Sequence, residues 1–254
     1  ALLDVCSRLP VNIWYESNPQ AHDQSFYPHI QSVLERGMLL IMDLGYLNFA
    51  VFNQLTQQAV TFLTRTKINL SYAVVKVLHR SAAVHDRLVW IGKEDTRQQI
   101  RLIEVLYKGT WYRYLTNELD PLVLPTAYAG ALYWQRWRIE DAFNIVKRLL
   151  GLAYFCSGSQ NAVELQLWST WLLYGALVDL TDQVADVLVK PFAALSLEMV
   201  YRSLYFFTQA YHRGQTDDLV SYLAQNTQLL GIVKRKPTPS KFSELLGLTS
   251  ASDP

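Results

Sequence analysis

The sequence GMLLIMDLGYLNFAVFNQLTQQAVTFLTRTK at residues 37–67 decides the class of fold. It opens with an apolar run at 37–43 that ends in a carboxylate and is followed by Gly45, a pattern typical of a buried strand and the turn after it. Residues 46–58 have the pattern of a helix, and residues 60–67 that of a further strand. Strands that alternate with helices predict an α/β domain.

The segments on either side extend this pattern. Before it, we expect short strands at 1–5 and 11–17 and a helix at 24–36, with Asp23 as a candidate N-cap. After it, apolar and polar residues alternate in short runs from about 68 to 120, which indicates an antiparallel β region inserted into the α/β domain. The remainder is predicted to be helical, at 126–150, 161–189, 195–212 and 216–229, before a basic, proline-containing tail at 234–242.

Composition limits the possible partners. The chain has 254 residues, half of them hydrophobic, and a net charge of +1, so any surface that attracts nucleic acid must be local. Its two cysteines form neither a disulfide framework nor a metal-ligand cluster, which favours a reduced, cytoplasmic protein. The most apolar stretch, residues 165–178, is shorter than the roughly 20 residues that span a bilayer, so we expect a core helix and no membrane partner.

Four residues with polar or charged side chains are spaced as on one face of a helix near the middle of the chain. Tyr133, Arg136, Glu140 and Lys147 follow the pattern Y-x2-R-x3-E-x6-K. On one continuous helix, at about 100° per residue, they would share a stripe about 60° wide. Arginine grips two phosphate oxygens and lysine acts as a point charge, so this stripe suits phosphate contact.

Asp43 and Glu140 are the candidate metal ligands. Catalytic groups of α/β sheets gather at the carboxyl ends of strands, where Asp43 is expected, and Mg²⁺ prefers a few hard oxygen donors completed by phosphate and water. Each residue also has a purely structural interpretation. Asp43 would cap the next helix, Glu140 would be a solvated charge paired with Arg136, and Tyr133 would belong to the core.

Taken together, these motifs resemble one large group of bacterial insertion-sequence transposases, the DDE enzymes that carry a YREK signature. Tyr133, Arg136, Glu140 and Lys147 match the signature itself. MLLIMDLGYLNF matches the strand that ends in the group's second catalytic aspartate, and FLTRTK matches the strand that follows it. The resemblance covers residues 1 to about 180. It implies an RNase H-like mixed sheet with helices, a β-rich insertion before the glutamate, and a helical C-terminal part.

The resemblance also divides the chain into segments. Residues 1–67 would be the first part of the catalytic core, 68–124 the β-rich insertion, 125–190 the second part of the core with the YREK helix, and 191–254 a C-terminal helical region with a basic tail.

The same resemblance implies roles for individual residues. Asp43 and Glu140 would be catalytic residues that bind Mg²⁺ or Mn²⁺, and the reaction would be cleavage and strand transfer at the ends of an insertion sequence. Arg136 and Lys147 would contact DNA phosphates, Tyr133 would position the cleaved end, and Arg65 and Lys67 are further DNA-binding candidates. The partners would be double-stranded DNA, at element ends and target, and a second copy of the chain on that DNA. The location would be the cytoplasm, associated with the nucleoid.

The chain departs from the group's pattern at the first catalytic aspartate. The opening strands resemble the second and third strands of the fold, so the first strand with its aspartate, and the DNA-binding region before it, are expected to be missing. Asp4 is the only aspartate in the strands expected upstream of Asp43. The alternative function is therefore a truncated, catalytically inactive remnant that at most binds DNA. A structural helical protein with a ladder of charges is the third hypothesis.

Overall fold

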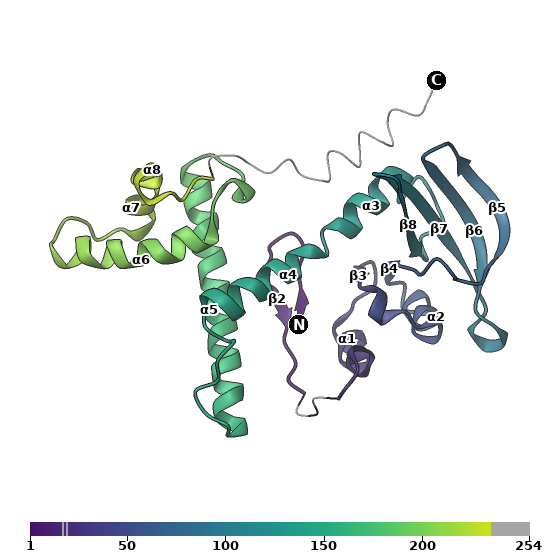
Figure 1. Cartoon of the computed structure of the whole chain (residues 1–254), viewed down its shortest axis with the longest axis horizontal. Coiled ribbons are helices and arrows are strands. Elements are labelled where there is room, and N and C mark those ends of the chain that lie inside the picture. The colour runs from purple at the N-terminus through teal and green to yellow at the C-terminus, as the bar shows by residue number, and fades with distance from the viewer. Residues whose placement is uncertain (17, 19, 235–254) are drawn as a thin grey trace. The chain divides into compact units, whose positions relative to one another are not determined.

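The computed structural model describes residues 1–16, 18 and 20–234 (Figure 1). The chain divides into two compact units. Of the described residues, we call 16–137 the sheet unit, and 1–15 together with 138–234 the helical unit.

One mixed sheet of six strands forms the centre of the sheet unit, in the order β3-β4-β8-β7-β6-β5. Its strands are β3 (Leu39–Met42), β4 (Thr61–Arg65), β5 (Ala73–Arg80), β6 (Val84–Ile91), β7 (Gln98–Tyr107) and β8 (Thr110–Thr116). Only β3 and β4 run parallel; every other neighbouring pair is antiparallel. The predicted α/β class with a mixed sheet is confirmed, and it is consistent with an RNase H-like fold.

Helices cover both faces of this sheet. On β4, Phe62 stacks against Phe52 of α2 (Phe49–Gln57), with ring centroids 4.2 Å apart. The next residue, Leu63, packs with Ala129 of α3 (Thr126–Trp134). Because successive side chains of a strand point to opposite faces, α2 and α3 lie on opposite sides of the sheet.

A buried ion pair lies beneath the start of α3. Arg101 of β7 and Asp86 of β6 have no exposed surface, and Arg101 Nε donates to Asp86 Oδ1 at 2.8 Å. The same guanidinium donates to the carbonyl of Leu124 at 2.6 Å and to Thr126 Oγ1 at 3.0 Å. The pair therefore joins two strands to the N-terminus of α3, and each buried charge has its hydrogen bonds.

The helical unit begins with a two-stranded antiparallel pair, β1 (Leu2–Leu3) and β2 (Pro10–Asn12). Its helices are α4 from Arg138 onward (the helix spans Trp137–Asn144), a π-helical segment at Ile145–Leu149, α5 (Gln160–Val187), α6 (Leu197–His212), α7 (Leu219–Gln225) and α8 (Thr227–Leu230). Buried residues of α5, α6 and α7, among them Val184, Val200 and Leu223, form one of its cores.

Two local expectations are wrong. Asp23 does not cap a helix: it opens a 3-10 turn (Asp23–Phe26), and α1 spans only Tyr27–Val33. The helix expected at 126–150 is interrupted at Gln135 and Arg136, whose amides bond three residues back, and it ends in the π-helical segment. The core helix expected at 165–178 is confirmed within α5, where Trp171, Tyr174 and Val178 are buried, although Leu165 and Leu172 are exposed.

Two further expectations concern the basic tail and membrane-spanning helices. The tail predicted at 234–242 lies outside the described residues, apart from Lys234. None of the helices in residues 1–16, 18 and 20–234 has the length and apolar character that a membrane span requires.

Candidate active site

Asp43 immediately follows β3, at the carboxyl end of the two parallel strands. Its carboxylate Oδ1 accepts a hydrogen bond from the amide of Leu44 at 2.7 Å, and so it caps the 3-10 turn Leu44–Tyr46. Its side chain is still 55% exposed. The capping role that the sequence left open is therefore real, and it uses Oδ1 while more than half of the side-chain surface stays exposed.

Tyr133 reaches this carboxylate from α3. Its hydroxyl donates to Asp43 Oδ1 at 3.3 Å, while its ring lies buried against Tyr114, with centroids 5.3 Å apart. Burial raises the pKa of the Tyr133 phenol; the positive charge of Arg136 opposes that shift and the carboxylate of Asp43 adds to it. The phenol therefore stays protonated and keeps donating over the physiological pH range. Tyr133 is both a core residue and a contact of Asp43.

Arg136 lies in the turn after α3 and extends toward the same carboxylate. Its Nη1 is 3.8 Å from Asp43 Oδ2, and its guanidinium lies over the rings of Tyr133 and Trp137, at 5.9 and 5.1 Å from their centroids. The side chain is 14% exposed, so aromatic rings and protein atoms restrict its orientation. A guanidinium held next to an exposed carboxylate is well placed to bind a phosphate there.

Arg65 and Lys67 lie on the neighbouring strand and just beyond it. Arg65 is the last residue of β4, is exposed, and lies over the ring of Tyr112 at 5.2 Å. Its charge lowers the pKa of Tyr133, which places it in the same electrostatic environment as Asp43 and Arg136. Lys67 is exposed two residues later. The sheet unit thus brings together Asp43, Tyr133 and Arg136, with Arg65 beside them.

Glu140 and Lys147 belong to the helical unit. Glu140 is half-buried in the first turn of α4. Lys147 is exposed in the π-helical segment, with its Nζ 5.3 Å from the centroid of the Phe143 ring. Because the helix is broken at 135–136 and widened at 145–149, the angle of 100° per residue does not apply from Tyr133 to Lys147. The single stripe expected from the spacing is wrong, and joint action of Glu140 with Asp43 stays a prediction.

Asp4 performs a local structural task. Its Oδ1 accepts from the amide of Ser7 at 2.6 Å and from the Ser7 hydroxyl at 2.8 Å, in the turn between β1 and β2. These bonds hold the pKa of the Asp4 carboxyl below its usual value. In the part of the chain that the structure describes, no three His, Cys, Asp or Glu residues cluster as a metal site would require.

The carboxylate of Asp43 fits a divalent cation as one ligand of a small set. It is a hard oxygen donor with an exposed side chain at a strand end. Mg²⁺ characteristically takes one or two protein carboxylates and completes its shell with water and substrate phosphate.

The sequence did not reveal what holds this site in place. Gln24 donates to the carbonyl of Gly45 at 2.9 Å, and the hydroxyl of Tyr27 donates to the carbonyl of Tyr46, so both fix the turn after Asp43. The Asp86–Arg101 pair similarly anchors the start of α3. None of these residues is marked by a motif, although the alternation of β6 and β7 would place Asp86 and Arg101 on one face.

A comparison with known protein families shows to which family this chain belongs. The family model described as "Transposase DDE domain" matches residues 1–175. The chain belongs to this transposase DDE domain family. The resemblance inferred from the four-residue signature together with Asp43 is thereby confirmed at the level of the family, while the YREK assignment and the missing first strand stay predictions.

Two curated relatives of this DDE domain are transposases by name. The chain is 29% identical over 155 residues to "Putative transposase y4zB" of Sinorhizobium fredii (strain NBRC 101917 / NGR234), an alignment that covers 57% of this chain and 43% of that protein. It is 27% identical over 153 residues to "Probable transposase for insertion sequence element IS5377" of Geobacillus stearothermophilus, covering 57% of this chain and 40% of that protein. The alignments therefore cover less than half the length of either relative.

Proposed function

We propose that this chain is a DNA transposase that catalyses divalent-metal-dependent cleavage and strand transfer at insertion-sequence ends. The observation that carries the proposal is the convergence of Tyr133 and Arg136 on the exposed carboxylate of Asp43. Membership of the DDE family and the names of its two relatives support the same function. The partner would be double-stranded DNA, with a second copy of the chain bound to the paired ends.

Each residue has a physical task in this proposal. Asp43 and Glu140 would hold a Mg²⁺ or Mn²⁺ ion, which supplies Lewis-acid activation of a phosphodiester. Tyr133 fixes the rotamer of Asp43 through its hydrogen bond to Oδ1, which leaves Oδ2 directed toward Arg136. Arg136 and Arg65 would contact a phosphate near that carboxylate, and Lys67 and Lys147 would add charge to the DNA contact.

Nicking of supercoiled plasmid DNA tests the catalytic assignment. The unmodified chain should nick DNA in Mg²⁺ or Mn²⁺, and both Asp43→Asn and Glu140→Gln should abolish nicking without loss of DNA binding. Glu198→Gln is a matched control, because Glu198 is an exposed carboxylate that pairs with Arg202 on α6. Nicking that survives both site substitutions would show the assignment to be wrong. DNA binding without nicking by the unmodified chain would favour the inactive remnant.

Tyr133→Phe separates positioning from catalysis. The variant keeps the ring that packs on Tyr114 and removes only the donor to Asp43. We expect the nicking rate at saturating DNA to fall about fivefold, with DNA affinity within about twofold of the original, because one hydrogen bond contributes about 1 kcal/mol. An unchanged rate would show that Tyr133 has only a packing role.

A further inference from the structure

Strand directions place several loops at the same end of the sheet as Asp43. β3, β4, β7 and β5 end there, and β8 and β6 begin there. The segments at this end are therefore the residues directly after β4, the loop 81–83 between β5 and β6, and the turn 108–109 between β7 and β8, while the connection 66–72 starts here and leads to the opposite end, where β5 begins.

Exposed cations are concentrated at this end. Arg65, Lys67, Arg80 and Lys108 are all exposed, and we call these four residues the basic end. Lys108 occupies the tip of the β7–β8 turn with a positive φ of 48°, and its Nζ lies 5.1 Å from the centroid of the Tyr107 ring. These three segments contain no aspartate or glutamate. From β4 to β5, four exposed cations therefore lie at this end of the sheet.

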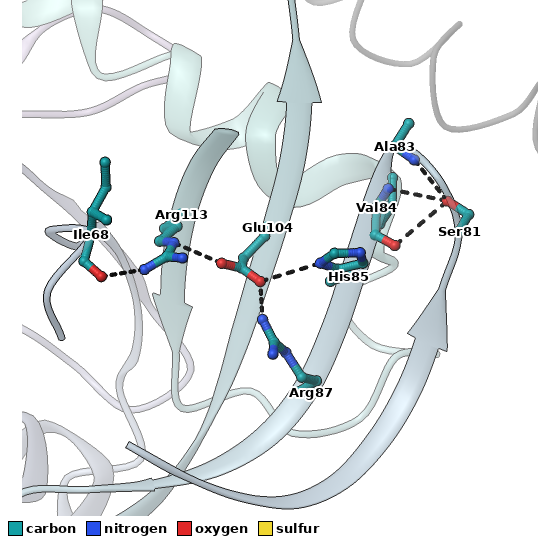
Figure 2. A network of polar contacts seen from close by, with 8 residues as sticks. All are labelled: Ile68, Ser81, Ala83, Val84, His85, Arg87, Glu104 and Arg113. Carbon is teal, nitrogen blue, oxygen red and sulfur yellow. Dashed lines mark hydrogen bonds and ion pairs between the residues drawn. The ribbon is translucent and has the colours of Figure 1, made fainter. Parts of the chain in front are cut away.

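The one glutamate in the adjoining row of side chains is already neutralised. Cross-strand register aligns Arg80, His85, Glu104 and Arg113 across β5, β6, β7 and β8. Figure 2 shows Glu104 between Arg113 on one side and His85 and Arg87 on the other. Glu104 is only 3% exposed. Burial and the nearby arginines lower the pKa of His85, which favours its neutral form. The two positive charges of Arg87 and Arg113 therefore exceed the single negative charge of Glu104.

At the opposite end of the same sheet, acidic residues outnumber cations in the loops. Its loops carry the acidic residues Glu35, Glu94, Asp95, Glu118 and Asp120 together with the cations Arg36, Lys93 and Arg97. From β4 to β5 the charges of the loops therefore differ along the strand direction, whereas beside β3 the exposed Asp23 and Asp43 lie at the same end as the basic residues. The difference from β4 to β5 produces the local basic surface that the composition required of any nucleic-acid contact.

The dimensions of the basic end suit a DNA backbone. Neighbouring strands lie about 4.8 Å apart, so the five steps from β3 to β5 span about 24 Å. One strand of duplex DNA carries a phosphate every 3.4 Å or so, which corresponds to about seven base pairs over that distance. Arg65 is in register with Tyr114 and Ile103, so the β7–β8 turn that carries Lys108 projects beyond the row that leads from Asp43 to Arg80, and a duplex along this row would pass beside that turn.

We propose that the basic end is a second DNA-contact surface, on which Lys108 and Arg80 bind backbone phosphates of the duplex that enters the site at Asp43. This inference rests on the proposed function and adds to it a surface on the β-rich region. Lysine and arginine side chains on loop tips bind the backbone regardless of sequence. The contact therefore contributes affinity and orientation, and it leaves recognition of the element end to other residues.

Salt-dependent binding to a fluorescent duplex of about 30 base pairs, measured in EDTA, tests this surface. The variant Arg80→Gln/Lys108→Asn removes two cations; asparagine tolerates the positive φ of residue 108. The matched control, Arg36→Gln/Lys93→Gln, removes two exposed cations from the opposite end. We expect the first variant to weaken binding at least about tenfold near 0.1 M salt and to lower the slope of log K against log [salt] by about 2, with little change in the control.

Three outcomes would overturn the inference: equal losses in both variants, no loss in either, or no duplex binding by the unmodified chain at low salt. The charge-preserving variant Arg80→Lys/Lys108→Arg should retain affinity and slope, which excludes misfolding as the cause of a loss. Because EDTA prevents cleavage, the experiment is independent of catalysis. Binding through the basic end without any nicking in Mg²⁺ would count against the proposed function alone.

Discussion

Asp86 and Arg101 place opposite charges in the interior of the sheet unit without any exposed surface. A buried ion pair is stable only when its desolvation is offset by close geometry and further hydrogen bonds. Here Thr126 supplies one of them, donating its hydroxyl to Asp86 Oδ2 at 2.5 Å. Since Thr126 opens the helix that carries Tyr133, the position of the Tyr133 hydroxyl at Asp43 depends on this pair.

Removing one member of the pair should be costly. Asp86→Asn leaves the guanidinium of Arg101 buried without its counter-charge, and we expect the free energy of unfolding to fall by about 3–5 kcal/mol, as measured by urea denaturation. Glu198→Gln, which breaks the exposed pair with Arg202, should cost less than about 1 kcal/mol. The double substitution Asp86→Leu/Arg101→Met should be less harmful than Asp86→Asn. A larger loss in the double variant would contradict this account.

At the scale of elements, two turns of the sheet require glycine for different reasons. Gly92 follows β6 with a φ of 76°, and a Cβ there would lie 2.3 Å from the carbonyl oxygen of Thr96. Gly109 in the β7–β8 turn has a φ of 77°, and a Cβ there would have no heavy atom within 4 Å. Any other residue at either position would have to adopt the left-handed backbone conformation, which costs free energy. At Gly92 the added side chain would also clash with the backbone of Thr96.

Alanine at the two positions separates these costs. Gly109→Ala should lower the free energy of unfolding by about 1–2 kcal/mol, the cost of a left-handed alanine. Gly92→Ala should cost at least about 1 kcal/mol more, because the turn must move to accommodate the methyl group. Urea denaturation of both variants provides the comparison. Equal losses would show that the β6–β7 turn relaxes freely.

Periodicity and turn residues predicted most elements of the sheet unit, because alternation and short apolar runs reflect burial on a sheet. They did not predict the break at Gln135 and Arg136 or the π-helical segment, since QRWRIEDAFNIVKRLL contains no glycine or proline and suits a helix throughout. They also located Asp43 correctly after its strand. Its contacts with Tyr133 and Arg136 depend on long-range packing, on which local pattern carries no information.

At the scale of the whole molecule, both units bury tyrosine hydroxyl groups. Burial raises the pKa of Tyr114 in the sheet unit and of Tyr174 in the helical unit to about 12. Their ordinary value is about 10, so the fold favours the protonated phenol. This contribution to stability is complete below about pH 10 and is lost as the pH rises toward 12.

The stability of the chain should therefore fall on the alkaline side. Urea denaturation at about pH 8, 10 and 11 should show a midpoint that decreases above pH 10, with up to about 1.4 kcal/mol lost per pH unit for each buried tyrosine. Tyr114→Phe should make that decrease shallower, whereas Tyr154→Phe should not, because Tyr154 is 83% exposed. An unchanged slope in Tyr114→Phe would contradict the assignment.

The position of β4 has a consequence for any shortened form of the chain. Its backbone pairs with β3 on one side and with β8 on the other, so β8 is what makes it an interior strand. A chain without residues 66–124 would leave that side of β4 with unpaired amide and carbonyl groups, flanked by the apolar Phe62 and Leu63. Such a strand templates the addition of strands from other molecules, and the shortened protein would aggregate.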